Sequence, residues 1–389
     1  KNEPATITSK ATYKPEIVPV QPTSEASTTS DVQGKVQTSS IVLDTEETGD
    51  DKGKTVNFNK GIEQGPKGER TELNPDTLTL LNEAGEEVTS VTTPQGKYEL
   101  DKANKTITFT PNKDFAGEAT PVKVQIKDAN GTKVETTYTP TVIEVTPTGK
   151  DSATSGPQGI AQTSPIVFNQ KDESDNTTVN FETGHERVEL KQDTLTLVNG
   201  NGEKVTTITV PEVGTYELKD GAITFTPVKT FKGTAEGVTV QVEDENGKVV
   251  TKKYVPTVTP VTPTSKTAES TEIQGKEQKG TPEFTPGNPE VPMDNEIPAT
   301  FEDGKTTKTV EKVGTYTVAK DGTVTFTPEK TFAGTAPSVT VKRVDKNGTP
   351  VTATYTPTVT PVVPTSKPAE STDIQGKEMQ DARSRPANI

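Results

Sequence analysis

Hydrophobic and polar residues alternate with a period of two along much of this chain. The clearest runs place a branched apolar residue at every second position: Val122, Val124 and Ile126; Val238, Val240 and Val242; Val339 and Val341. In the third run Arg343 takes the next apolar position, which predicts a bulge or a snorkelling arginine. Such alternation is typical of half-buried strands, and no segment carries the apolar stripe of a helix. We therefore expect an all-β protein with almost no helix.

The same sequence blocks return at domain-sized intervals. A tract of the form Tyr-x-Pro-x-Val or Ile, followed by Pro-Thr-Ser or Pro-Thr-Gly, occurs four times and begins at Tyr13, Tyr138, Tyr254 and Tyr355. A Gln-Gly pair follows each copy, at Gln33, Gln158, Gln274 and Gln375, which gives spacings of 125, 116 and 101 residues. A period of this length predicts tandem domains, not a solenoid of short repeats.

Turn residues separate the alternating runs inside each unit. The Asn-Gly pairs at Asn130, Asn246 and Asn347 predict type I′ hairpins with positive φ at both central residues, as do Asp220-Gly221 and Asp321-Gly322. The first two units also carry extra strand-like tracts, Thr77–Leu81 and Thr194–Val198, which indicate an added hairpin at a sheet edge. About seven short strands per unit predict tandem β-sandwich repeats.

We place repeat 1 at residues 22–146, repeat 2 at 147–262 and repeat 3 at 263–363. Residues 1–21 are expected to end a preceding repeat, and residues 364–389 to start a further repeat or to form a non-repeat tail. Closely spaced prolines at each boundary remove donors and fix φ, so they favour extended, semi-rigid joints. The tract that starts at each tyrosine is expected to form the last strand of one repeat and to run directly into the next.

The recurring positions are our candidates for residues that define the repeat structure. They comprise the Gln-Gly pairs, core-phase aromatic residues, turn glycines and Asn-Gly pairs: Gln33, Gly34, Tyr98, Phe109, Phe115, Gly117, Asn130, Gly131, Tyr138, Gln158, Gly159, Tyr216, Phe225, Phe231, Gly233, Asn246, Gly247, Tyr254, Gln274, Gly275, Tyr316, Phe326, Phe332, Gly334, Asn347, Gly348 and Tyr355. For the Gln-Gly pair, a bulge at the start of the first strand is favoured over a contact between neighbouring domains.

Composition narrows the possible functions. The 389 residues include 28% hydrophobic and 5% aromatic residues, so each core is expected to be small. We therefore expect the repeats to have modest stabilities that differ from one another. The net charge of -14 disfavours nucleic acid and anionic membranes as partners. The absence of cysteine excludes disulfides and thiol catalysis, and the single histidine leaves no Cys/His zinc site. No apolar stretch is long enough for a membrane span, and the start at Lys1 suggests an internal fragment of a longer protein.

No group of residues predicts catalysis or a cofactor. His185 stands alone in a polar run and has no counterpart in the other units, so a solvated loop residue is favoured and no enzyme is expected. Two acidic clusters could hold calcium, but they lack a spaced ligand order and are expected to be solvated loops: Asp44, Glu46, Glu47, Asp50 and Asp51; Asp172, Glu173 and Asp175. Three lysines recur at one position and are candidates for isopeptide crosslinks, although plain turn lysines are favoured: Lys113, Lys229 and Lys330.

Three tracts in the third unit carry a family resemblance: Thr271–Glu277, Gly314–Gly334 and Tyr355–Pro361, with looser copies in the first two units. In combination they resemble the repetitive domain of CshA-type fibrillar adhesins from streptococci and related Gram-positive bacteria. The resemblance implies a cell-wall-anchored, extracellular adhesin whose repeats form a surface fibril. It also implies that a separate amino-terminal region, which this chain lacks, binds host matrix or other microbes.

Two functions follow as expectations. In the first, the repeats form a structural stalk that projects the separate binding region, and their partners are the neighbouring repeats of the same chain. In the alternative, the repeats themselves bind a host matrix protein or another microbe's surface through exposed sheet edges. An extended array of domains is expected in either case.

Overall fold

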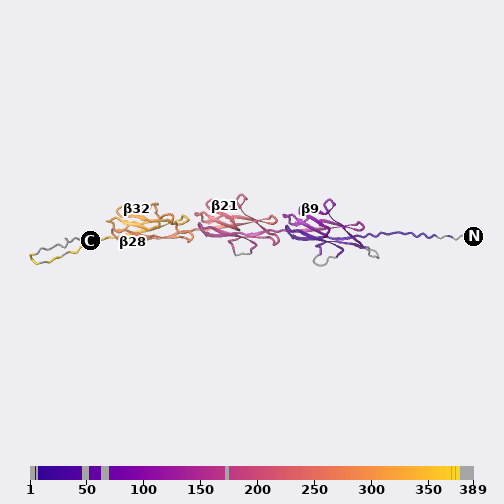
Figure 1. Cartoon of the computed structure of the whole chain (residues 1–389), viewed down its shortest axis with the longest axis horizontal. Helices are drawn as coiled ribbons and strands as arrows, with labels where there is room; N and C mark the ends of the chain where they lie inside the picture. Colours follow the sequence, from indigo (N-terminus) through magenta and orange to yellow (C-terminus); the bar gives the residue numbers. More distant parts are fainter. Residues whose placement is uncertain are drawn as a thin grey trace.

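The computed structural model describes residues 5, 8–45, 52–62, 70–170, 175–368, 370–372 and 374–376. These residues form β-strands, turns and irregular segments, and none of them lies in a helix. The strands make three successive units that lie in line, with the chain entering at one end of the rod and leaving at the other (Figure 1). The structure confirms the expected all-β array of tandem sandwiches.

Repeat 1 contains strands β1(Thr23–Glu25), β2(Ser27–Val32), β3(Gln37–Leu43), β4(Val56–Asn59), β5(Gly61–Ile62), β6(Arg70–Thr71), β7(Leu73–Leu81), β8(Glu87–Val88), β9(Ser90–Thr93), β10(Gly96–Asp101), β11(Thr106–Pro111), β12(Gly117–Glu118), β13(Val122–Asp128) and β14(Lys133–Ile143). Repeat 2 contains β15(Thr148–Lys150), β16(Ser152–Pro157), β17(Gln162–Phe168), β18(Val179–Glu182), β19(Leu190–Val198), β20(Lys204–Val205), β21(Thr207–Val210), β22(Gly214–Lys219), β23(Ala222–Pro227), β24(Gly233–Thr234), β25(Val238–Asp244) and β26(Val249–Thr259). Repeat 3 contains β27(Thr264–Lys266), β28(Ala268–Ile273), β29(Gln278–Gly280), β30(Glu283–Thr285), β31(Thr300–Phe301), β32(Thr307–Val310), β33(Gly314–Val318), β34(Val324–Pro328), β35(Gly334–Thr335), β36(Val339–Val344) and β37(Pro350–Thr360). Many of these strands are edge segments of two to four residues. Segments this short cannot be recognised from alternation in the sequence.

Each repeat packs two main sheets face to face, and no sheet is shared between repeats. In repeat 2 one sheet has the order β15-β18-β17-β23-β22-β21 and the other β16-β26-β25-β19-β20, with β24 also paired to β26. Repeat 1 has the same arrangement, whereas in repeat 3 the short β31 takes the place of the longer β19. The hairpin at this edge is therefore the part that repeat 3 lacks.

The first strand of the second sheet pairs in parallel with the last strand of the same repeat. The pairs are β2 with β14, β16 with β26, and β28 with β37. Each last strand has 11 residues, so it extends about 36 Å at about 3.3 Å per residue. Because the two strands run in the same direction, the chain enters a repeat at one pole and leaves it at the opposite pole.

A polar network holds each of these parallel strand pairs together at one point. In repeat 1 the Thr29 hydroxyl contacts both the Gln37 Oε1 at 2.6 Å and the Tyr138 hydroxyl at 2.8 Å. The Gln37 amide then donates to the main-chain oxygen of Thr141 on the last strand. Repeat 2 uses Thr154, Gln162 and Tyr254 in the same way, and repeat 3 uses Ser270, Gln278 and Tyr355. A buried tyrosine that keeps its hydroxyl bonded avoids the cost of desolvating an unpaired polar group.

Buried aromatic pairs fill the three cores. Tyr98 lies against Phe109 with ring centroids 4.6 Å apart, Tyr216 against Phe225 at 4.7 Å, and Tyr316 against Phe326 at 4.6 Å. All six rings are essentially inaccessible to solvent. The partly buried Phe115, Phe231 and Phe332 pack against the edges of the same clusters. These aromatic candidates therefore lie in or beside the cores.

The Asn-Gly turns differ from the expected type I′ form. Positive φ occurs at Gly131, Gly247 and Gly348 but not at the preceding asparagines. The cause is an aspartate at the end of the preceding strand: Asp244 Oδ1 accepts hydrogen bonds from the main-chain nitrogens of Asn246 and Lys248, which stabilises a turn with positive φ at the glycine alone. The type I′ prediction was also wrong for Asp321-Gly322, whereas Asp220 and Gly221 both have positive φ.

Arg343 occupies an apolar position of strand β36, and the strand stays in register there. Strand β36 pairs continuously with β37 across this residue. The guanidinium lies 5.9 Å from the centre of the Phe284 ring and donates to Asn295 Oδ1 at 2.7 Å. The snorkelling arginine is therefore correct and the bulge is not, and the charge covers an aromatic ring.

We expect alkali to unfold the repeats together with ionisation of their buried tyrosines. Burial raises the pKa of Tyr138, Tyr216 and Tyr316 to about 12, whereas an unfolded tyrosine ionises near about 10. The folded state therefore binds more protons in this range, so stability is complete below about pH 10 and falls as the pH rises toward about 12. Tyrosinate absorbance and circular dichroism recorded through this range should change in parallel.

The Tyr216→Phe variant is the matched control, because it removes one ionisable group from repeat 2. Its alkaline transition should move to higher pH for that repeat alone. Ionisation of the core tyrosines well before any loss of sheet signal would contradict the expectation.

Candidate functional site: the joints between repeats

The joints bring together the two kinds of recurring pair that the cores do not use. The Gln-Gly turn of one repeat meets the Asn-Gly turn of the next, at residues 33–35 with 245–248 and at residues 158–160 with 346–347. We call these joint 1 and joint 2. Only short connections, residues 144–147 and 260–263, separate the last strand of one repeat from the first strand of the next.

The glutamine of each Gln-Gly turn holds the connection in place. Gln33 is 5% exposed, and its side-chain oxygen accepts a hydrogen bond from the Val145 main-chain nitrogen in the connection. Its side-chain nitrogen donates to the Lys113 main-chain oxygen at 2.9 Å. Gln158 makes the same two bonds, with Val261 and Lys229. An amide side chain supplies both a donor and an acceptor, which explains why glutamine recurs here.

The asparagine of the next repeat completes this arrangement. Asn246 Nδ2 donates to the main-chain oxygen of Gln33 at 3.1 Å, and Asn347 Nδ2 donates to that of Gln158 at 2.8 Å. A Cβ placed on Gly34 would overlap the Asn246 side chain, and one on Gly159 would overlap Asn347. The glycine therefore meets two requirements, a φ of about 80° and close approach of the next repeat.

The recurring lysine also reaches across each joint. Lys113 Nζ donates to the main-chain oxygen of Glu245 at 3.1 Å, and Lys229 Nζ donates to that of Lys346 at 3.0 Å. The lysines therefore contact a neighbouring repeat, which the interpretation as plain turn residues did not foresee. Their ammonium groups meet carbonyl oxygens, and no isopeptide partner is evident at these contacts.

Joint 1 adds three ion pairs and a small apolar cluster. Lys35 pairs with Glu245 at 2.6 Å, Arg187 with Asp31 at 2.5 Å, and Lys248 with Glu144 at 2.7 Å. The Lys248 ammonium lowers the pKa of the Glu144 carboxyl through a hydrogen bond and charge attraction. Between these polar contacts, three buried valines pack together from both repeats and the connection: Val32, Val145 and Val188.

Joint 2 keeps the hydrogen bonds but not this charge pattern. Ile160 stands where joint 1 has Lys35, and Lys346 stands where it has Glu245. Lys346 pairs within its own repeat, with Asp294 at 2.8 Å, and this contact raises the pKa of Lys346. Val261 and Val291, which correspond to Val145 and Val188, are also buried. Across the residues that the structure describes, no ion pair crosses joint 2.

For the Gln-Gly pair the favoured bulge at the start of the first strand was wrong, and the alternative, a contact between neighbouring domains, is what the structure shows. The pair does form a turn, since the Lys35 nitrogen donates to the Val32 oxygen, but it also contacts the neighbouring repeat. The backbone angles explain why the asparagine recurs as well. Asparagine is not needed for φ in these turns, so its recurrence at Asn246 and Asn347 requires another cause, which is the bond across the joint. A recurring glycine beneath the connection was also missed: Gly184 and Gly287 lie against Thr146 and Thr262.

The remaining candidates that the structure describes form no chemical site. The His185 side chain accepts a bond from the Arg187 main-chain nitrogen in the same loop. Asp44 pairs with Lys60, and the hydroxyls of Thr177 and Thr178 lower the pKa of Asp175 to about 2. The other acidic-cluster candidates, Glu46, Glu47, Asp50, Asp51, Asp172 and Glu173, lie outside the described residues. Among the residues that are described, no three potential metal ligands come together.

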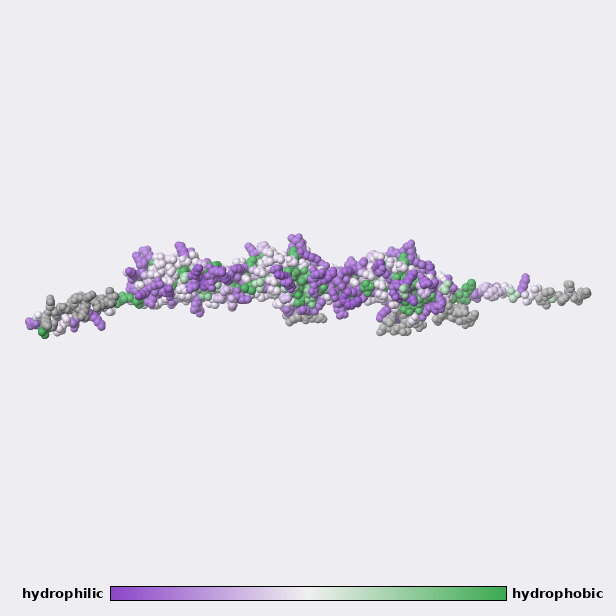
Figure 2. Space-filling model, in the orientation of Figure 1, coloured by the Kyte–Doolittle hydropathy of each residue, from purple (hydrophilic) through white to green (hydrophobic). Residues whose placement is uncertain are grey.

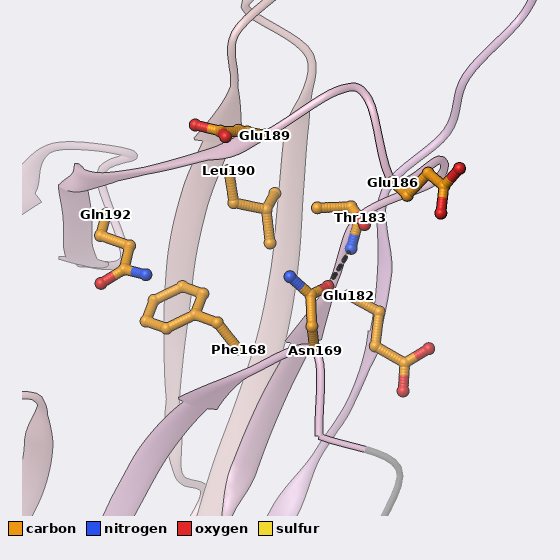
Figure 3. A pocket seen from close by; sticks show the side chains of 8 residues that line it. All are labelled: Phe168, Asn169, Glu182, Thr183, Glu186, Glu189, Leu190 and Gln192. Atoms are coloured by element: carbon orange, nitrogen blue, oxygen red, sulfur yellow. Dashed lines mark hydrogen bonds between the residues drawn. The ribbon is translucent and has the colours of Figure 1, made fainter.

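An open cleft of about 660 Å³ lies beside strand β18 in repeat 2 and carries several carboxylates. It is lined by Phe168, Asn169, Glu182, Thr183, Glu186, Glu189, Leu190 and Gln192. The Thr183 nitrogen donates to Asn169 Oδ1 at 2.8 Å, and the carboxylates of Glu182, Glu186 and Glu189 point in different directions (Figure 3). They do not converge on a common ligand position.

Comparison with known proteins gives one family match. The family described as the surface adhesin CshA repetitive domain matches residues 19–142, 144–258 and 260–359. The NMR structure of repeat domain 13 of the fibrillar adhesin CshA from Streptococcus gordonii is 63% identical, covering 18% of this chain and 90% of that chain, with a TM-score of 0.12. A crystal structure of mouse cadherin-23 is 12% identical, covering 88% of this chain and 100% of that chain, with a TM-score of 0.36. No curated protein matches the chain in sequence. No helix that could cross a membrane occurs within the described residues.

Loss of the asparagine should loosen joint 1 without unfolding either repeat. The native chain lacks cysteine, so spin labels at Lys102→Cys and Lys219→Cys report the distance between repeats 1 and 2 alone. We expect Asn246→Ala to broaden this distance distribution at least twofold, because the bond to Gln33 is lost, and to lower the free energy of unfolding by no more than about 1.5 kcal/mol. Asn130→Ala is the matched control, since its turn has the same form but faces no preceding repeat in the described chain.

Joint 1 should also respond to salt and acid more strongly than joint 2. Screening at about 1 M salt weakens exposed ion pairs, so the distribution between positions 102 and 219 should broaden while that between labels at 219 and Lys320→Cys stays constant. The ionised Glu144 carboxylate stabilises joint 1 above its ordinary pKa of 4.5. This stabilisation is lost as the pH falls through the lowered pKa that Glu144 has in the folded chain. Equal responses at the two joints would show that the ion pairs do not hold joint 1.

Proposed function

Because the chain belongs to the surface adhesin CshA repetitive-domain family, we propose that it is a structural stalk that holds a separate binding region away from the cell surface. The family match supports an extracellular surface adhesin as the parent protein. We further propose that the parent protein is anchored to a bacterial cell wall. One observation favours the stalk role over direct binding: the recurring asparagine and lysine bond one repeat to the next, and the recurring glutamine holds the connection between them.

The geometry of the repeats suits a spacer. The parallel pairing of first and last strands puts the connections at opposite poles, so each added repeat lengthens the rod instead of folding back (Figure 1). A force along the rod would pull on strands bonded side by side over six residue pairs in each repeat. Such a pair must slide as a unit, which favours resistance to load.

The surface supports the same proposal over the alternative in which the repeats bind a ligand. The visible face is mainly hydrophilic, with small and separated hydrophobic areas (Figure 2). Among the described residues no large aromatic side chain within the three repeats is exposed. Binding sites for proteins usually present aromatic anchors or a continuous apolar patch. The alternative therefore has less support, although sheet edges remain available to partners.

Scattering and binding measurements on the intact chain test the proposal together. Small-angle X-ray scattering should give a rod whose maximum dimension is well beyond 100 Å, since each last strand alone extends about 36 Å. A variant with Gly34→Ala and Gly159→Ala should show a shorter and broader distance distribution, because both joints are obstructed. Immobilised host matrix proteins should not retain the native chain. Saturable binding that survives dilution to nanomolar concentration would favour the alternative instead.

A further inference from the structure

Repeat 3 ends in a surface that has the form of an unfilled joint. Its members are Ile273, Gln274, Gly275, Lys276, Lys330 and Val362, and we call them the open joint surface. Gln274 makes the same first contacts as its counterparts, because its side-chain oxygen accepts a bond from the Val362 nitrogen at 3.2 Å and its main-chain nitrogen donates to Thr360. The turn is therefore preformed before any neighbour arrives.

Exposure shows what this surface lacks. Val145 and Val261 in the two filled joints are 2% and 4% exposed, whereas the equivalent Val362 is 53% exposed. Val32 is 6% exposed in joint 1, whereas the equivalent Ile273 is 48% exposed. Hydrophobic atoms are visible where the chain leaves this end of the rod (Figure 2). Within the described part of the chain, no group donates to the main-chain oxygen of Gln274 or occupies the space above Gly275.

Charge at one pair of positions specifies the occupant. At joint 1 the residue after Gln-Gly, Lys35, forms an ion pair with the residue before Asn-Gly, Glu245. At joint 2 the same two positions hold Ile160 and Lys346, and no ion pair joins them. The open joint surface presents Lys276 at this position, and Lys330 lies at the position whose counterparts reach the carbonyl of the same facing residue. Two ammonium groups close to a third would repel it, whereas a carboxylate would be attracted.

We infer that the open joint surface binds the Asn-Gly turn of a following repeat of this family whose residue before the asparagine is acidic, as Glu245 is. This inference rests on the proposed stalk function and adds a rule for which repeats can follow one another. The asparagine donates to Gln274, its side chain occupies the space above Gly275, and an apolar residue equivalent to Val188 covers Ile273 and Val362. The turn of repeat 1 in a second copy fits less well, because Ala129 precedes its asparagine.

A four-repeat chain tests the rule directly. The chain through Val363 is continued by a second copy of residues 147–262, with spin labels at Lys320→Cys and at the added counterpart of Lys219→Cys. The added Glu245 should give a narrow distance distribution. Glu245→Lys in the added copy should broaden it at least twofold, and Lys276→Ile should then restore the narrow distribution by recreating the pairing of joint 2.

Other outcomes would overturn the inference in distinguishable ways. Equal widths with glutamate and lysine would show that charge does not select the neighbour. Broad distributions for all three chains, while labels at 219 and 320 give a narrow one, would show that the surface does not receive a repeat. Broad distributions at both places would overturn the stalk itself. Concentration-dependent dimerisation of the native chain in sedimentation, lost with Asn130→Ala, would show that the occupant is a second copy with no acidic residue.

Discussion

The parallel pairing of the first and last strands is the constraint on which the rest of the molecule depends. An antiparallel pair would return the chain to the pole where it entered, and successive repeats would then lie beside one another. The parallel pair carries the chain across the full length of the sandwich, so the connection always leaves from the far pole. The network of Thr29, Gln37 and Tyr138 fixes this pair in register, because each member has its partner on a different strand. The buried tyrosine of the core, the direction in which the chain crosses each repeat and the shape of the rod thus all depend on this parallel strand pair.

The sequence predicted the cores well because their signal is local. Alternation over Val238–Asp244 and the aromatic residues Tyr216 and Phe225 is visible in a window of a few residues, and the buried faces match it. The extra tract near Thr194 likewise forms a strand, β19, which pairs with the edge strand β20. The fold class could be predicted from periodicity because the two faces of a strand are set by alternate residues of one short segment, whereas contacts between domains join distant segments.

The joints could not be predicted in the same way, because their partners are far apart in sequence. Gln33 and Asn246 are 213 positions apart, and Gln158 and Asn347 are 189 apart. Each residue also has a sufficient local explanation: asparagine and glycine suit a turn, and lysine suits a surface. Only the positive φ at Gly247 without one at Asn246 shows that the local explanation of the asparagine is incomplete. Recurrence drew attention to the glutamine and asparagine positions, but the stacking of repeats was needed to show that they meet.

The two joints separate what is required from what varies. Both contain a glutamine that holds the connection, a glycine beneath an asparagine, and a lysine bonded to a carbonyl of the next repeat. These contacts use main-chain atoms on at least one side, so they tolerate changes in neighbouring side chains. Among the described residues, the ion pairs that cross a joint all lie at joint 1, where Lys35, Arg187 and Lys248 reach across. Because partly exposed pairs of this kind contribute little to affinity but oppose wrong combinations, they are better suited to choosing a neighbour than to holding it. A stalk built this way can keep one geometry at every joint while its charges decide the order of its repeats.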